Sequence, residues 1–399
     1  MKKLFLLVLC LSFVFVAFGC KDKDNDNDDD NQPQQATTVK FGSCGPLSGS
    51  VSIYGQAVKA GVELAIQEIN AAGGINVGGT MKQIELINFI NDEADPNKAG
   101  AALSTLVAAD VDVVVGAVTS GATEGLISEA VKEGVPVITP TGTADKLTVG
   151  ENGNEREERL NIFRACFYDS YQGEYMAKYA AEKGMKTAYV LFNNSEDYSE
   201  GLKDAFVETA EAKGMTVTAV GYGKDDKQFA SFVSPIVSGD YDCVYVPDYY
   251  ENVYNILSTL YGAGYDGVAY GGDGWDGVVQ QIKAGDNVAF LENCFYTNHY
   301  FGASENAVVK KFVEAYKAKW DGEAPVSFAA LGYDAVYIVK QAIEQAQSFE
   351  YEAVVKALTE GTFTGLVTSA NEFKFDENGN PEKDAVVITF KDGKEVEAK

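Results

Sequence analysis

From residue 38 to residue 263, short apolar runs alternate with segments that place apolar residues at helical spacing. The apolar runs lie at 39–45, 84–90, 111–117, 136–139, 187–192, 217–222 and 243–246. The helical segments lie at 54–72, 96–109, 121–133, 170–183, 198–213, 226–238 and 250–263. Continuous apolar strands that alternate with helices are typical of a parallel sheet covered on both faces. The sequence therefore predicts an α/β fold built from doubly wound parallel sheets.

The length of 399 residues predicts two such lobes, because one hydrophobic core rarely grows this large. Extended segments near residues 165 and 296 are the predicted crossings, which join the lobes as a multi-strand hinge. We assign 38–160 plus 297–368 to lobe 1, and 161–296 plus 369–399 to lobe 2. In the last part, 372–398, we expect antiparallel strands joined by an Asp-Glu-Asn-Gly turn at 376–379.

The N-terminal segment has the layout of a secretory signal. Two lysines are followed by an apolar run from 4 to 18 and by Gly19 directly before Cys20. The run is shorter than the ~20 residues that a membrane-spanning helix needs. We therefore predict a lipoprotein signal peptide at 1–19 and lipidation of Cys20. The acidic stretch 20–37 cannot form a core, so we predict a disordered tether and a location outside the cytoplasm, anchored by lipid to a bacterial membrane.

Composition excludes several classes of function. The net charge of −27 argues against nucleic acid as a partner, because a phosphate backbone demands a basic face. Export argues against enzymes that depend on ATP or NAD, so no cofactor is expected. His299 is the only histidine and no Cys-x-x-Cys occurs, which leaves little for a zinc site or a Ser-His-Asp triad. A hydrolase with a Cys294–His299 dyad is a remote alternative.

Four cysteines remain in the body of the chain, and we predict free thiols, although a pair among them stays open. They are Cys44, Cys166, Cys243 and Cys294.

Hydroxyl side chains follow two neighbouring strands of the first predicted lobe. Thr119 and Ser120 come after the run 111–117 and directly before a helix, where free backbone N–H groups favour a carboxylate. The alternative is that one of them only caps the helix. Thr141 and Thr143 follow the next strand. Because ligands of open α/β sheets bind beyond the carboxyl ends of strands, these loops are candidate binding loops.

In the second predicted lobe, Asp273 lies between two glycines at the end of a short strand, 268–271. Such an aspartate is either a turn former or an acceptor that faces the cleft. Hydroxyls on one lobe and a carboxylate on the other would complement an α-amino acid. In this hypothesis Ser120 and Thr143 bind its carboxylate and Asp273 binds its ammonium group.

Several stretches in order resemble one known family. They are Gly-Pro-Leu-Ser-Gly at 45–49, 61–75, 94–99, 116–125 with 138–148, Tyr-Gln-Gly at 171–173, and 328–336. Together they are similar to the substrate-binding proteins of branched-chain amino acid ABC transporters. The resemblance covers about 38 to 395. It implies the type 1 periplasmic binding protein fold, in which two lobes close on a ligand.

The resemblance also implies roles for individual residues. The carboxylate-binding serine corresponds to Ser120, the threonine that contacts both charged groups to Thr143, and the acidic residue to Asp273, where the family commonly has Glu. Aromatic residues over the ligand correspond to Tyr54, Tyr198 and Tyr249; ordinary interior packing is the alternative for the last two. The remaining candidates for the pocket wall are Val118, Thr119, Thr141, Phe167 and Trp275.

The function implied is capture of an amino acid, with an aliphatic, branched or aromatic side chain favoured, and delivery to an ABC transporter permease. The expected partners are this ligand, the permease and the membrane, with the protein itself a monomer and not an enzyme. Two alternatives stay open. The two-lobed protein could signal its ligand-bound state to a membrane receptor, or it could bind a carboxylate metabolite that is not an amino acid.

Overall fold

The computed structural model describes residues 38–369 and 371–398. The predicted signal peptide at 1–19, the tether and the lipidation site Cys20 lie outside the described residues. In the part of the chain that is described, no helix combines the length and the apolar character needed to cross a membrane.

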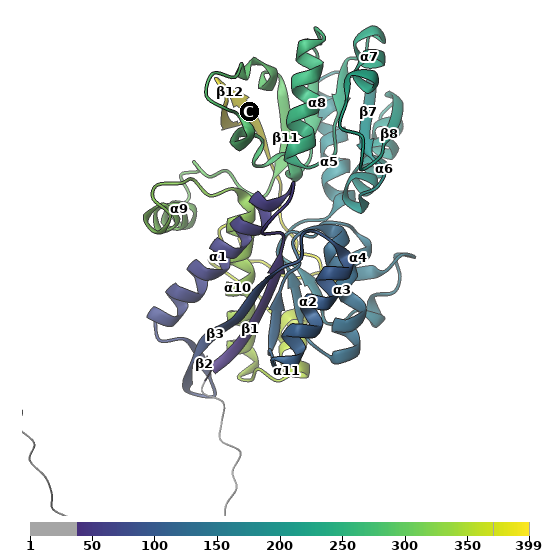
Figure 1. Cartoon of the computed structure of the whole chain (residues 1–399). Helices are drawn as coiled ribbons and strands as arrows, with labels where there is room; N and C mark the ends of the chain where they lie inside the picture. Colours follow the sequence, from purple (N-terminus) through teal and green to yellow (C-terminus); the bar gives the residue numbers. More distant parts are fainter. Residues whose placement is uncertain (1–37, 370, 399) are drawn as a thin grey trace, which may run out of the picture. The chain divides into compact units, whose positions relative to one another are not determined.

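The first sheet has six strands in the order β2-β3-β1-β4-β5-β6 (Figure 1). They are β1 (Thr38–Gly45), β2 (Ile75–Val77), β3 (Thr80–Asn91), β4 (Val113–Val115), β5 (Val137–Thr139) and β6 (Ile162–Arg164). All neighbours are parallel except the β2–β3 hairpin. Val113 and Val115 belong to the core formed with α1 (Ser52–Ala71) and α10 (Ser327–Ala346), whereas Val114 packs with α2 (Pro96–Ala108) and α3 (Ser120–Glu133). Because successive strand residues face opposite sides, the sheet is covered on both faces.

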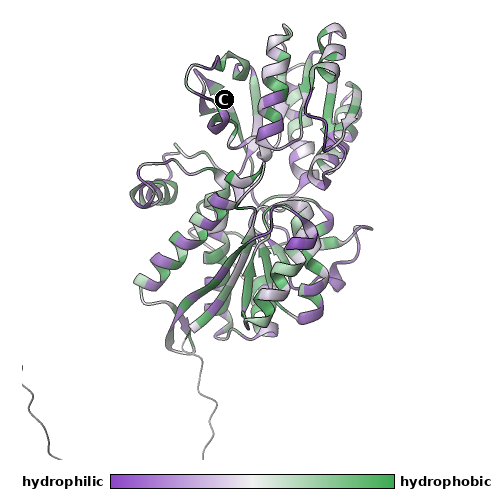
Figure 2. Cartoon of the chain, viewed as in Figure 1, coloured by the Kyte–Doolittle hydropathy of each residue, from purple (hydrophilic) through white to green (hydrophobic). Residues whose placement is uncertain are grey.

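The second sheet has seven strands in the order β13-β12-β11-β10-β9-β7-β8. They are β7 (Thr187–Asn193), β8 (Thr216–Tyr222), β9 (Cys243–Tyr245), β10 (Val268–Gly271), β11 (Cys294–Asn298), β12 (Val386–Lys391) and β13 (Lys394–Glu397). Its helices are α5 (Asp169–Glu182), α6 (Asp197–Ala212), α7 (Ala230–Ser238) and α8 (Tyr250–Gly262). Strands β7 to β11 are parallel and β12 and β13 are antiparallel. The predicted fold class is therefore confirmed, and Figure 2 shows the apolar strands between helices whose outer faces are polar.

Shorter elements and helices without a sequence prediction complete the chain. These are α4 (Lys146–Val149), α9 (Ala307–Lys319), α11 (Tyr351–Glu360) and the 3-10 turns at Arg156–Glu158, Asp273–Trp275, Val278–Gln281 and Val288–Leu291.

Three segments cross between the two sheets. They run from β6 to α5, from β11 to α9, and from α11 to β12. The first two crossings coincide with the extended segments near residues 165 and 296, and two of the predicted lobe limits lie close to strands there. The limit at 160/161 falls before β6, which pairs with β5, and the limit at 296/297 falls inside β11, which pairs with β12. A three-residue strand such as β6 has too little apolar pattern to mark which sheet it joins.

The predicted turn at 376–379 forms, with the Gly379 N–H donating to the carbonyl of Asp376 at 3.0 Å, but it does not connect the two longest C-terminal strands. It closes only the isolated bridge between Phe375 and Pro381, whereas β12 and β13 are joined at Asp392 and Gly393. Both of these residues have positive φ, 52° and 71°. Two such residues form the hairpin turn whose twist matches that of the strands, which explains why the hairpin forms there.

Candidate functional site

A small cavity lies where loops from the carboxyl ends of both sheets meet. Its lining residues are Tyr54, Val118, Thr119, Ser120, Thr141, Thr143, Tyr198, Tyr249, Asp273, Gly274 and Phe328. Nine of the eleven residues predicted as pocket residues are among them. The space open to the centres of water molecules is about 10 Å³, roughly what one water needs. A ligand of amino-acid size therefore requires the two lobes to separate.

The hydroxyl-rich loops after β4 and β5 are tied to each other. The Ser120 Oγ accepts a hydrogen bond from the backbone N–H of Ala144 at 3.2 Å, and the Thr141 Oγ1 donates to the carbonyl of Val118 at 2.6 Å. Ser120 is the first residue of α3, and the Thr119 side chain makes no cap hydrogen bond. The capping alternative was therefore wrong, and the Ser120 hydroxyl lies at the cavity beside the N-terminus of a 14-residue helix.

Asp273 contributes a buried carboxylate from the end of β10. Its side chain is 2% exposed. Its Oδ1 accepts hydrogen bonds from the Tyr198 hydroxyl at 2.9 Å and from the Gln172 Nε2 at 3.1 Å, and its Oδ2 lies 2.9 Å from the His299 Nε2. A carboxylate offers about four lone-pair sites, so about one remains for a further donor. The sequence prediction of an acceptor that faces the cleft is consistent with this geometry.

Gln172 and His299 are supporting residues that the sequence analysis did not assign to the site. The Gln172 Nε2 donates to both Asp273 and Asp169, and its Oε1 accepts from the Asp273 N–H and the Thr297 hydroxyl. Burial, followed by the charge of Asp145, raises the pKa of the Asp169 carboxyl well above its usual value. Two signals were present in the sequence, since Gln172 lies in the Tyr-Gln-Gly motif and His299 is the only histidine.

His299 is neutral at pH 7, because burial lowers the pKa of its imidazole to about 4 despite the hydrogen bond to Asp273. Its ring stacks on Phe167 with centroids 3.8 Å apart. The thiol of Cys294 donates instead to the carbonyl of Phe290, and burial raises its pKa above the usual range. The Cys294–His299 dyad is therefore excluded.

The other thiols are also buried and free, and burial raises the pKa of each, which confirms that Cys44, Cys166, Cys243 and Cys294 are unpaired. Within residues 38–369 and 371–398, no cluster of three acidic, cysteine or histidine residues could hold a metal ion.

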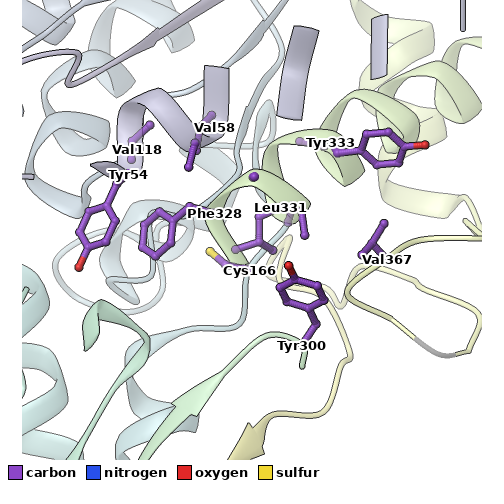
Figure 3. Packing of buried hydrophobic residues seen from close by; sticks show 14 of the residues in the cluster. Tyr54, Val58, Val118, Cys166, Tyr300, Phe328, Leu331, Tyr333 and Val367 are labelled. Atoms are coloured by element: carbon purple, nitrogen blue, oxygen red, sulfur yellow. The ribbon is translucent and has the colours of Figure 1, made fainter. Parts of the chain in front are cut away.

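Aromatic rings close the remaining side of the cavity. Tyr54 stacks on Phe328, with ring centroids 3.9 Å apart and planes 7° apart. Figure 3 shows the two rings beside each other. Tyr198 stacks in the same way on Tyr249, with centroids at 4.9 Å. The rings of Tyr54 and Tyr249 meet edge to face, with centroids 5.7 Å apart. The Tyr54–Phe328 stack of the first lobe therefore contacts the Tyr198–Tyr249 stack of the second. Phe328 was not predicted as a pocket residue, although it begins the motif at 328–336.

Contacts between the lobes hold this arrangement. The Tyr54 hydroxyl donates to the carbonyl of Gly274 and accepts from the N–H of Tyr250 at 3.2 Å. The ammonium of Lys146 lies 3.0 Å from the carboxylate of Asp197. The lobes thus meet around the cavity in a closed arrangement.

Phe167 and Trp275 do not line the cavity, and their assignment to its wall was wrong. Phe167 stacks on the far side of His299 and lines a different hollow. Trp275 is fully buried and its Nε1 donates to the carbonyl of Val246 at 2.7 Å. Trp275 follows Asp273 by two positions in a 3-10 turn, which has about three residues per turn, so the two side chains point in different directions.

Comparisons with known proteins find relatives over almost the whole described part of the chain. The sequence matches the family described as periplasmic binding protein over residues 38–395. The leucine-, isoleucine-, valine-, threonine- and alanine-binding protein of Pseudomonas aeruginosa is 30% identical over 86% of this chain and 87% of its own length. The substrate-binding protein LivJ of Streptococcus pneumoniae, solved with isoleucine, is 32% identical over 90% of this chain and 100% of its own, with a TM-score of 0.80. A solute-binding protein of R. palustris, solved with benzoate, shares the fold at 23% identity over 90% of this chain and 95% of its own, with a TM-score of 0.78.

Proposed function

The chain belongs to the periplasmic binding protein family, and from this premise we propose that it captures an α-amino acid between its two lobes. It is a solute-binding protein of the branched-chain amino acid ABC transporter type, not an enzyme, and the family acts outside the cytoplasm. The proposal goes further in three respects, namely the ligand, the residues that bind it and the delivery to a permease.

One observation carries the proposal: a hydroxyl-lined helix N-terminus and a buried carboxylate border the same small cavity from opposite lobes. The carboxylate of the ligand would accept from Ser120, Thr143 and the first N–H groups of α3. Its ammonium would donate to the remaining lone pair of Asp273. These are the two ends of every α-amino acid, and the two lobes supply one partner each.

The side chain of the ligand would lie against aromatic faces. Tyr54, Phe328 and Tyr249 present apolar surface, whereas the polar groups of the cavity are assigned to the two charged ends. This environment favours an aliphatic, branched or aromatic amino acid. The relatives from Pseudomonas aeruginosa and Streptococcus pneumoniae, whose names and complexes include such amino acids, support this choice.

The mechanism is a hinged clamp. The ligand docks on the Ser120 side, and closure then brings Asp273 and the tyrosines onto it, so the contacts made only in the closed form stabilise that form. We further propose that the closed protein, a monomer held to the membrane through a lipid on Cys20, is recognised by a transporter permease.

The test is a thermal-shift screen of the purified protein, stripped of bound ligand by unfolding and refolding, against the twenty amino acids. A ligand at 100 times its Kd adds about 2.7 kcal/mol to the free energy of unfolding. Two matched analogues of leucine sharpen the screen: 4-methylpentanoate lacks the ammonium, and 3-methylbutylamine lacks the carboxylate. We expect a shift with leucine, isoleucine, valine or an aromatic amino acid, and none with either analogue at the same concentration. Benzoate is screened as well. A shift with 4-methylpentanoate or with benzoate, and with no amino acid, would overturn the assignment of Asp273.

A further inference from the structure

Two helices of the first lobe, α1 and α10, begin side by side at its boundary with the second lobe (Figure 1). They run in the same direction, because Tyr54 stacks on Phe328 near the two first turns and Val58 lies against Gly332 one turn further along. The Tyr54 hydroxyl bonds backbone groups of the second lobe, so both first turns face that lobe. A helix N-terminus carries free N–H groups and a partial positive charge. The first lobe therefore presents two sets of donors to the second.

Neither helix is capped by the residue that precedes it. The N-cap positions are occupied by Val51 and Val326, whose apolar side chains cannot accept a hydrogen bond. Other helices of the chain have the usual cap: Asp95 accepts from two backbone N–H groups at the start of α2, and Asn306 accepts from one at the start of α9. The N–H groups of α1 and α10 thus depend on acceptors from elsewhere.

The second lobe supplies these acceptors. The Asp276 Oδ2 accepts from the backbone N–H of Ser327, the first residue of α10, at 2.6 Å. The Tyr250 hydroxyl accepts from the backbone N–H of Ile53, in the first turn of α1, at 3.3 Å. Each of these caps belongs to one lobe while its helix belongs to the other, and we call them trans caps. They form only where the two lobes meet.

Asp276 is the stronger trans cap because it brings a carboxylate. Its side chain is buried, and its Oδ2 also accepts from the Asn298 Nδ2 at 3.1 Å. Burial raises the pKa of the Asp276 carboxyl, whereas the hydrogen bonds from Ser327 and Asn298 oppose this shift. A negative charge at the N-terminus of the 20-residue helix α10 is favoured by the helix dipole as well as by the hydrogen bond. The hydroxyl of Tyr250 is neutral and contributes the hydrogen bond alone.

We propose that the trans caps stabilise the closed arrangement with or without a ligand, and that Asp276 is a positioning residue of the amino-acid site. Asp276 does not line the cavity. It holds Ser327, and the next residue, Phe328, lines the cavity and stacks on Tyr54. When the lobes open, both helices lose their caps and their first turns return to water. The effect on ligand release rests on the proposed function, whereas the effect on closure does not.

Small-angle X-ray scattering of the whole protein without ligand tests the effect on closure. Asp276→Ala should have a larger radius of gyration than the native protein, because its closed form loses a cap. Asp276→Asn keeps an oxygen that can accept from Ser327 but lacks the charge, so its radius should lie between the two. Asp95→Ala is the matched control, since it removes a helix cap within one lobe, and its radius should equal the native value. Equal radii for Asp276→Ala and the native protein, or an equal expansion in Asp95→Ala, would overturn the proposal.

Tyr250→Phe is a second test that removes no buried charge. It keeps the ring against Tyr54, at 4.9 Å between centroids, but removes the acceptor for the Ile53 N–H. The radius of gyration should increase less than in Asp276→Ala, and the double variant should expand more than either single variant. Expansion in Tyr250→Phe but in neither variant of Asp276 would refute the role of Asp276.

Release kinetics test the positioning role. With the amino acid identified in the screen, Asp276→Ala should release its ligand about tenfold faster in stopped-flow displacement. The Kd should increase by a smaller factor, because the open form that the ligand enters also becomes more populated. Asp276→Asn should recover part of the loss of residence time.

The same control separates positioning from stability. Asp95→Ala should lower the Tm, since a helix loses its cap, and should leave the release rate unchanged. A purely structural role of Asp276 would give this same result, so a native release rate in Asp276→Ala would refute the positioning role. If no amino acid binds at all, the proposed function fails, while the scattering results still decide whether the trans caps stabilise closure.

Discussion

His299 and Asp273 form a buried pair, with the His299 Nε2 2.9 Å from the Asp273 Oδ2 and both side chains at most 2% exposed. The imidazole is uncharged at pH 7, so it orients the Asp273 carboxyl group through a hydrogen bond and not through an ion pair. Tyr198 and Gln172 hold the other oxygen. Asp273 thus presents a fixed acceptor to the cavity.

Replacing Asp273 by Ala should weaken amino-acid binding by about 2–5 kcal/mol, because a buried ammonium would lose its charged partner. Calorimetric titration measures the change directly. Asp266→Ala is the control, since Asp266 is exposed just before the opposite end of β10. Equal affinity of the Asp273→Ala variant and the native protein would remove Asp273 from the site.

The hydrogen bond of His299 should contribute to folding as well as to the site. His299→Phe keeps a ring against Phe167 but leaves Asp273 without one donor, so the free energy of unfolding should fall by about 1–3 kcal/mol. His299→Gln can still donate an N–H and should lose less. Chemical denaturation of both variants measures the difference. Equal losses would show that packing, and not the donor, is what His299 supplies.

The low pKa of His299 predicts a dependence of stability on pH. An unfolded histidine titrates near 6.5, whereas burial lowers the pKa of His299 to about 4 in the folded protein. Between these values the unfolded chain binds more protons, so this contribution is complete above about pH 6.5 and is lost as the pH falls towards about 4.

Buried Asp92 and Asp334 have pKa values raised to about 6, so their contribution to the free energy of unfolding rises as the pH falls. Both residues are present in the native protein and in the His299 variants, so their contribution cancels when the two proteins are compared. The stability of the native protein should therefore fall relative to His299→Gln as the pH is lowered from 7 to 4 in denaturation experiments. Parallel curves for the two proteins would show that His299 does not titrate in this way.

The Ser120 hydroxyl should matter for the carboxylate end of the ligand. Ser120→Ala removes a donor to a charged group and should weaken amino-acid binding by about 1.5–3 kcal/mol. Ser104→Ala on α2 is a matched control, because Ser104 is an exposed helical serine that bonds only the carbonyl of Gly100. Calorimetry with the same amino acid compares both variants. An affinity loss confined to Ser104→Ala, or absent from both, would contradict the role given to Ser120.

Much of the fold could be predicted because the strands are continuous apolar runs and the helices between them have an apolar face. The loops that carry Ser120, Thr143 and Asp273 could be located in the same way, since the carboxyl ends of parallel strands meet at one edge of a sheet. Assigning roles to these three residues needed the family resemblance as well.

The partners of Asp273 could not be found from the pattern. Gln172 precedes it by 101 positions and His299 follows it by 26, and only the packing of α5 and β11 against β10 brings them together. Trp275 was expected in the cavity wall because it lies close to Asp273 in the sequence, but proximity in sequence does not determine the direction of a side chain in a tight turn. The type of residue at a strand end is thus predictable, whereas the residues that orient it depend on tertiary packing.

The hydrogen bond from Tyr54 to the carbonyl of Gly274 joins the two lobes and should exist only when they are closed. Tyr54→Phe keeps the stack on Phe328 but removes this bond, so the closed form loses about 1 kcal/mol relative to the open form. Ligand release should become about fivefold faster, since opening precedes release. Stopped-flow displacement of the bound amino acid measures the rate. Tyr261→Phe is the control, because Tyr261 is exposed and its hydroxyl accepts only from Asn287 within the same lobe. An unchanged release rate in Tyr54→Phe would mean that closure does not depend on this bond.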